Sequence, residues 1–130
     1  MNTAKKIRAV VADDEMHIRR MVVSVLKTMQ CEIVGEASNG QEAIELFEKE
    51  RPDILFMDIN MPLKRGDDAL VEIMQAHPNA FVIMLTSVSD VSTIQKCVDA
   101  GAVDYIRKDT PIPELKLMLK EAWDEFNKKR

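Results

Sequence analysis

The chain of 130 residues is 46% hydrophobic and 31% charged, which is typical of one soluble globular domain with a sizeable core and excludes a disordered segment. A formal net charge of −4 argues against direct nucleic-acid binding, and no apolar run approaches the roughly 18 residues of a membrane span. Residues 1–6 are polar and lack the apolar core of a signal peptide. We therefore expect a cytoplasmic protein in which Cys31 and Cys97 stay reduced.

Short apolar runs alternate with helical patterns through the first part of the chain. Residues 7–12 predict a strand, and apolar residues then recur every three or four positions from Ile18 to Met29, as one face of a helix requires. Residues 31–36 predict a second strand, broken by Gly35, before a second helix. The first part of the chain therefore reads as two βα units.

The third strand, residues 53–57, is apolar almost throughout and lacks polar alternation. We therefore expect it to be buried on both faces, as in a parallel sheet. Asp58 is the first residue to emerge from this strand, and Pro62 fixes a turn just beyond it. A third helix is predicted to begin at Gly66 and to end near His77.

The same alternation continues to the end of the chain. Residues 81–85 predict a fourth strand, 91–100 a helix, 102–106 a short fifth strand, and 112–126 a last helix with a solvated basic end at 128–130. Strict βα alternation implies a parallel sheet with right-handed crossovers and helices on both faces. The commonest five-stranded, doubly wound α/β sheet has the strand order 2-1-3-4-5.

In that order the sheet reverses beside the first strand, so ligands are expected between the carboxyl ends of the first and third strands. The third strand brings Asp58 there, and the first ends in the acidic run Asp13-Asp14-Glu15. Two carboxylates about 4 Å apart repel by roughly 4 kcal/mol at an effective dielectric constant of about 20, so we expect a cation among them. Oxygen ligands, including the backbone carbonyl of Asn60, favour Mg²⁺ over zinc.

Two further side chains are predicted to project toward this crevice. Lys108 follows the fifth strand, and Thr86 lies at the end of the fourth. Together they can hold the oxygens of a transferred phosphoryl group while Asp58 acts as its nucleophile, because such transfer needs mainly positioning and charge neutralisation.

The chain resembles a CheY-like receiver domain of a bacterial two-component response regulator over about residues 6–126. The resemblance rests on the acidic pair Asp13-Asp14 after the first strand, Asp58 in an Asp-Ile-Asn-Met-Pro stretch, Thr86-Ser87 after the fourth strand, and Tyr105 with Lys108 at the fifth. It implies a flavodoxin-like (βα)5 fold, a single receiver domain over residues 1–130 and no output domain in this chain.

By this resemblance, Asp58 accepts a phosphoryl group from a histidine of a sensor kinase or a histidine phosphotransfer protein. Asp14, Asp58 and the Asn60 carbonyl would bind Mg²⁺ directly, and Asp13 would hold it through water. The lysine and threonine at the crevice would contact the phosphoryl oxygens. Such a domain promotes its own phosphorylation and dephosphorylation but is not an enzyme with an external substrate.

The resemblance also implies a switch, in which Tyr105 swings inward when Thr86 is drawn to the phosphoryl group. The surface that changes would be helix 91–100, strand 102–106 and helix 112–126. A downstream output protein would bind this surface, and the domain would be a monomer or a phosphorylation-dependent dimer.

One departure from the family pattern is that Lys108 is followed by Asp109, whereas most receivers have a proline there with a cis peptide bond. A non-proline cis bond costs about 3–4 kcal/mol, so we expect a trans bond and a less rigid approach of the lysine. The Lys-Asp-Thr-Pro stretch resembles receivers joined to helix-turn-helix output domains. An alternative is therefore a receiver cut from a longer DNA-binding regulator.

Two other classes of protein compete with the receiver. A flavodoxin-like cofactor-binding protein would need Gly, Ser or Thr as phosphate donors after the first strand, where this chain has Asp13 and Asp14. A Mg²⁺-dependent aspartyl phosphatase would need a second acid two residues past Asp58, where this chain has Asn60. A colourless protein with no turnover of external phosphoesters would exclude both classes.

Overall fold

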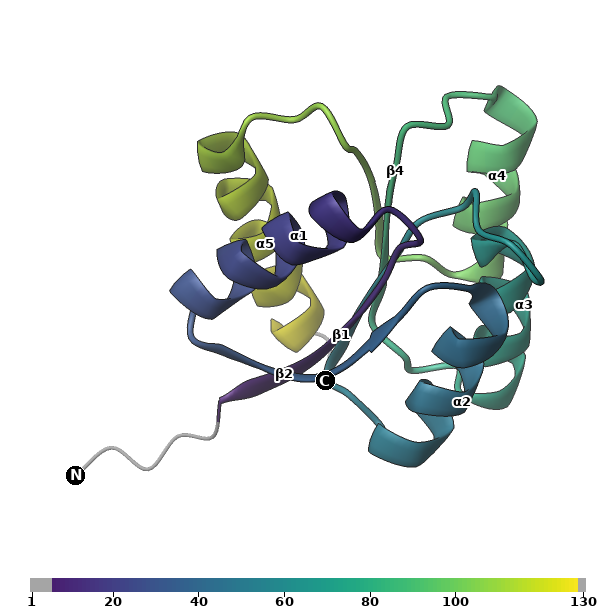
Figure 1. Cartoon of the computed structure of the whole chain (residues 1–130), viewed down its shortest axis with the longest axis horizontal. Helices are drawn as coiled ribbons and strands as arrows, with labels where there is room; N and C mark the ends of the chain where they lie inside the picture. The colour runs from purple at the N-terminus through teal and green to yellow at the C-terminus, as the bar shows by residue number, and fades with distance from the viewer. Residues whose placement is uncertain (1–5, 129–130) are drawn as a thin grey trace.

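The computed structural model describes residues 6–128, in which five strands alternate with five helices (Figure 1). In chain order these elements are β1 Ile7–Ala12, α1 Met16–Thr28, β2 Cys31–Ala37, α2 Gly40–Glu50, β3 Ile54–Met57, α3 Gly66–Ala76, β4 Val82–Thr86, α4 Val91–Ala100, β5 Asp104–Arg107 and α5 Ile112–Lys128. The predicted basic end of the last helix continues to residue 130, and its residues 129 and 130 lie outside the described part of the chain.

The five strands are parallel and lie in the order β2-β1-β3-β4-β5, which confirms the predicted topology. Figure 1 shows α1 and α5 on one face of the sheet and α2, α3 and α4 on the other. This is the doubly wound, flavodoxin-like arrangement. Because the strand order reverses beside β1, the carboxyl ends of β1 and β3 lie next to each other at one edge of the sheet.

The sheet separates two hydrophobic cores, because successive side chains of a strand point to opposite faces. In β1, Val10 and Ala12 belong to the core beneath α2 and α3, whereas Ala9 and Val11 belong to the core beneath α1 and α5. All four residues of β3 are buried, as predicted for a central strand of a parallel sheet. The strand that leads to Asp58 is therefore held from both sides.

The boundaries of β2, β3 and β4 differ from the prediction, and β3 begins at Ile54 instead of residue 53. β2 is not broken at Gly35, because a shift in its register with β1 between Ala9 and Val10 lets pairing continue to Ala37. β4 begins one residue late, at Val82, and includes Thr86 as its last residue. Thr86 therefore pairs within the sheet instead of following it.

The short last strand also lies further along the chain than predicted. β5 begins at Asp104, whereas an apolar run from Ala102 predicted an earlier start. The Ala102 N–H donates to the carbonyl of Cys97 and completes the end of α4 after Gly101, whose φ of 108° stops the helix. The apolar character of Ala102 thus reflects a partly covered position at the end of α4, not a place in the strand.

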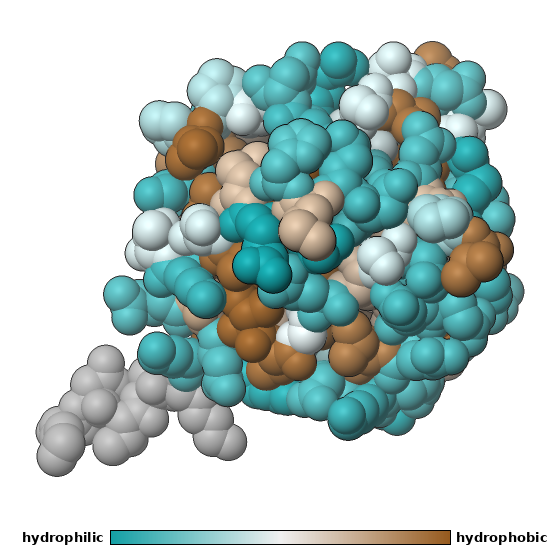
Figure 2. Space-filling view, viewed as in Figure 1, coloured by the Kyte–Doolittle hydropathy of each residue, from teal (hydrophilic) through white to brown (hydrophobic). Residues whose placement is uncertain are grey.

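Figure 2 shows that hydrophilic residues cover most of one face of the molecule, with hydrophobic residues gathered mainly near the centre of the view. Within residues 6–128, no helix has both the length and the apolar character that crossing a bilayer requires. Cys31 and Cys97 are buried free thiols. The face seen in Figure 2 is therefore predominantly polar.

Candidate functional site

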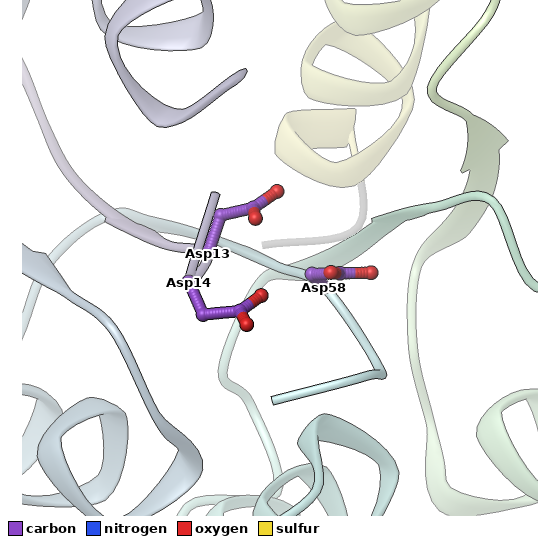
Figure 3. Close-up of side chains that lie close together, drawn as sticks. All are labelled: Asp13, Asp14 and Asp58. Carbon is purple, nitrogen blue, oxygen red and sulfur yellow. The ribbon is translucent and has the colours of Figure 1, made fainter. Parts of the chain in front are cut away.

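Backbone pairing at the carboxyl edge of the sheet brings the predicted acidic residues together. The N–H of Asp58 donates to the carbonyl of Ala12 at 2.9 Å, which places Asp58 beside the end of β1. Asp13, Asp14 and Asp58 each offer a carboxylate oxygen within 4.8 Å of the others, and in Figure 3 Asp13 and Asp14 extend toward the side on which Asp58 lies. Asp13 and Asp58 are buried, whereas Asp14 is exposed.

Lys108 lies at the centre of this acidic crevice. Its N–H donates to the Thr86 carbonyl at 3.0 Å, so the pairing of β4 with β5 fixes where the lysine leaves the sheet. Its Nζ lies 2.9 Å from Asp13 Oδ2, 2.8 Å from Glu15 Oε1 and 3.0 Å from Asp58 Oδ2. The lysine side chain is only 9% exposed, so the ammonium group is largely withdrawn from water.

The crevice remains strongly acidic even with the lysine inside it. Burial alone would lower the pKa of Lys108, but hydrogen bonds to Glu15, Asp13 and Asp58 outweigh burial and raise that pKa above its ordinary value. The hydrogen bond from Lys108 lowers the pKa of the Glu15 carboxyl. Burial raises the pKa of Asp13, and the same lysine opposes that rise only in part. One ammonium group therefore neutralises only part of the carboxylate charge.

Local hydrogen bonds orient the two buried carboxylates. Asp13 Oδ1 accepts from the N–H of Glu15 at 2.9 Å, and Asp58 Oδ1 accepts from the N–H of Ile59 at 2.7 Å. The loop beyond Asp58 is closed at Gly66, whose N–H donates to the Ile59 carbonyl at 2.8 Å. A Cβ atom on Gly66 would lie 1.8 Å from the Asp58 carbonyl oxygen, so this close approach requires glycine.

Thr86 and Tyr105 meet at the backbone of Val88, in the loop between β4 and α4. The hydroxyl of the fully buried Thr86 accepts a hydrogen bond of 3.2 Å from the Val88 N–H. The hydroxyl of the half-buried Tyr105 donates to the Val88 carbonyl at 2.5 Å. The two predicted switch residues are thus joined through one loop residue.

The donor set at this edge suits a hard divalent cation. The ligand atoms available from Asp13, Asp14 and Asp58 are carboxylate oxygens, the type that Mg²⁺ prefers. Asn60, predicted to add its backbone carbonyl, is exposed two residues beyond Asp58, and its side-chain oxygen accepts from Arg65 at 3.3 Å. These residues therefore fit the predicted metal.

Two features of the site were not predicted from the sequence. Glu15 was noted only as part of an acidic run, and its contact with Lys108 depends on a side chain that reaches across to another loop. Val88 contributes backbone groups, for which its apolar side chain gives no signal. The expected trans bond between Lys108 and Asp109 is confirmed, since the peptide bonds of the described residues include no cis bond.

The doubly wound sheet, with an acidic pair, an aspartate just after the third strand and a largely buried lysine side chain at its carboxyl edge, defines the receiver class of signalling domains. A model of the response regulator receiver domain family matches residues 9–120. The chain belongs to this family, and its receiver is CheY-like.

Similar proteins are known from both sequence and structure. The chain is 38% identical over 101 residues to chemotaxis protein CheY of Thermotoga maritima, a match that covers 78% of this chain and 84% of that protein. It is 40% identical over 108 residues to transcriptional regulatory protein PdtaR of Mycobacterium tuberculosis, covering 83% of this chain but 52% of PdtaR. The chain therefore spans about half the length of that relative.

The fold has an equally clear counterpart among solved structures. A CheY-like response regulator receiver domain protein from Methanospirillum hungatei matches with a TM-score of 0.90 and 25% sequence identity. The match covers 97% of this chain and 100% of that one.

Proposed function

We propose that the chain is a phosphoacceptor switch of a two-component phosphorelay, with Asp58 as the acceptor. The observation that carries this proposal is the surroundings of Asp58, which directly follows β3, is 3% exposed and has Lys108 Nζ 3.0 Å from its Oδ2. Asp13 and Asp14 complete an acidic crevice around it. Membership of the receiver family supports a histidine of a sensor kinase or phosphotransfer protein as the phosphodonor.

In the proposed transfer, a carboxylate oxygen of Asp58 attacks the phosphorus of a phosphohistidine. An O–P bond forms, the P–N bond breaks, and its electron pair returns to the histidine nitrogen. Lys108 is charged and lies beside the acceptor, so it can neutralise the phosphoryl oxygens as the group arrives. Hydrolysis reverses the modification when water attacks phosphorus and the Asp58 carboxylate leaves.

Mg²⁺ is the cofactor of this proposal. Asp14, Asp58 and the Asn60 carbonyl would hold the cation directly, and Asp13 would hold it through water, as the resemblance to receivers implies. The oxygen donor set and the uncompensated charge of the crevice support this assignment. When bound, the cation supplies further neutralisation of phosphoryl charge.

The signal is proposed to leave the site through Thr86, Val88 and Tyr105. If the Thr86 hydroxyl is drawn toward a phosphoryl group, it releases the Val88 N–H. Tyr105, which is hydrogen-bonded to the Val88 carbonyl, would then move together with that loop. The surface that changes is α4, β5 and α5. Exposed apolar residues there, including Val98 at 55% and Leu117 at 57%, support binding of an output protein or a second copy.

The proposal is tested by incubating the protein with acetyl phosphate and Mg²⁺ and measuring its intact mass. Wild type is expected to gain one phosphoryl group, and Asp58→Asn none. Asp53→Asn is the matched control, because Asp53 directly precedes the first residue of β3, at the end of the strand opposite Asp58. The Asp53 side chain accepts a hydrogen bond from the Arg8 N–H, and an asparagine oxygen can accept the same bond. Full phosphorylation of Asp58→Asn would show that another residue is the acceptor.

A further inference from the structure

Glu15 makes a contact that its place at the start of α1 does not require. It is the N-cap residue of that helix, yet its side chain makes no capping hydrogen bond. Its carboxylate instead accepts a hydrogen bond of 2.8 Å from Lys108 Nζ. The two residues come from loops 93 positions apart in sequence, so this pair spans the crevice.

The three carboxylates around Lys108 differ in what else they are placed to do. Asp13 and Asp58 are buried and belong to the group close enough together to hold a metal ion. Among the described residues that group is completed by Asp14 and does not include Glu15. Glu15 is 49% exposed at its side chain and stands at the rim. It is therefore the partner of Lys108 that metal binding leaves available.

We propose that Glu15 is a positioning residue for Lys108, holding the ammonium group at the crevice when Asp13 and Asp58 are engaged by the cation. This inference rests on the proposed function of the site. A lysine head group on a flexible four-carbon stem has many rotamers, and a fixed ion pair limits them. Because Lys108 must meet the phosphoryl oxygens in one place, loss of this anchor lowers the fraction of molecules ready for transfer.

The alternative explanation is that Glu15 acts only as a negative charge at the rim. Exposed ion pairs contribute little in general, and Glu15 is half exposed. Lys108, however, is 9% exposed, so one partner of this pair is largely desolvated. The two explanations differ in one respect: positioning acts through Lys108 alone, whereas a rim charge acts whether or not the lysine is present.

A double-mutant cycle on the rate of Asp58 phosphorylation separates them. We would measure the maximal rate with acetyl phosphate at saturating Mg²⁺, so that altered metal affinity does not contribute. Glu15→Ala is expected to lower this rate about five- to tenfold, and Glu15→Gln, which keeps an acceptor oxygen, by less. In a Lys108→Ala background, Glu15→Ala is expected to have no further effect. An unchanged rate in Glu15→Ala, or the same drop without Lys108, would overturn the proposal.

A second measurement does not depend on phosphorylation. The ¹H–¹⁵N signal of the Lys108 ammonium group, identified by its loss in Lys108→Arg, is expected to persist with Mg²⁺ in wild type and to vanish in Glu15→Ala. Glu36→Ala is the control, since Glu36 is a carboxylate that pairs with Arg19 and Arg20 instead. A Lys108 signal that persists unchanged in Glu15→Ala contradicts the inference. If wild type accepts no phosphoryl group, the proposed function fails, while this spectrum still decides the role of Glu15.

Discussion

Tyr105 donates a hydrogen bond of 2.5 Å to the backbone carbonyl of Val88, and this bond ties β5 to the loop before α4. The N–H of Val88 donates to the hydroxyl oxygen of Thr86 at the end of β4. Thr86 at the end of β4 and Tyr105 in β5 are therefore connected by two hydrogen bonds that share Val88. A change at either bond alters the constraint on the loop.

Thr86→Ala is expected to uncouple this surface from Asp58 without removing the acceptor. Beryllofluoride, a stable analogue of the phosphoryl group, should bind at Asp58 in both proteins, because the acidic residues and Lys108 are retained. Amide NMR spectra of wild type should then change at Tyr105 and along α5, with much smaller changes in Thr86→Ala. Ser87→Ala removes the neighbouring exposed hydroxyl and should behave as wild type. Equal shifts in wild type and Thr86→Ala would exclude Thr86 as the switch.

Mg²⁺ is expected to stabilise the protein by relieving repulsion among the crevice carboxylates. A ligand at 100 times its Kd adds about 2.7 kcal/mol to the free energy of unfolding, which a thermal melt detects readily. Asp14→Ala should melt higher than wild type without the metal, since one crowded charge is gone and Lys108 pairs with Asp13 and Asp58 instead. The variant should gain less from Mg²⁺. An equal gain would show that Asp14 is not a ligand.

Gly66→Ala is expected to destabilise the fold severely, by about 3 kcal/mol or more, because the added Cβ would lie 1.8 Å from the backbone oxygen of Asp58. That oxygen cannot move without displacing Asp58. Gly35→Ala is the control, since its Cβ would meet only the flexible side chain of Leu46 at 2.9 Å. Urea denaturation of both variants measures the difference, and similar losses would mean that the Asp58 loop adjusts freely.

The order of strands followed from the sequence because βα alternation and the buried third strand leave few topologies open. The sequence predicted for the same reason that Asp13 and Asp58 lie close together, because each directly follows a strand beside the point where the strand order reverses. The first and last residues of the strands followed less directly from the sequence. Ala102 is apolar and partly covered, but its N–H completes the end of α4, and hydropathy does not separate that use from strand pairing.

The ion pair between Lys108 and Glu15 was not predicted from the sequence, for a different reason. The sequence predicted that Lys108 would approach the site less rigidly, because a proline does not follow it. The structure places Glu15, Asp13 and Asp58 around its Nζ, so side chains far away in sequence supply the constraint. Periodicity and motif spacing describe which residues reach the crevice edge. They do not describe which charged groups pair once there.

Asp67, in the first turn of α3, connects this helix to α4 through an ion pair with Lys96. Its carboxylate lies 3.1 Å from Arg65 Nε and 3.3 Å from Lys96 Nζ, and the residue is 4% exposed. Burial favours a higher pKa for Asp67, but the hydrogen bonds and charges of Arg65 and Lys96 outweigh it and lower the pKa below its ordinary value of 3.8. The ionised form therefore stabilises the folded state.

Because the folded pKa of Asp67 is lowered, its contribution is fully present above pH 3.8 and is lost as the pH falls through the lower folded value. Asp67→Asn should cost about 1–3 kcal/mol at pH 7, and this difference from wild type should shrink steadily below pH 3.8. Asp68→Asn is the matched control: Asp68 pairs with the same Lys96 at 2.6 Å but its side chain is 52% exposed, so a smaller loss is expected. Urea unfolding of the three proteins at several pH values measures these differences. A cost for Asp67→Asn that is the same at neutral pH and well below 3.8 would show that the carboxylate charge does not hold α3 to α4.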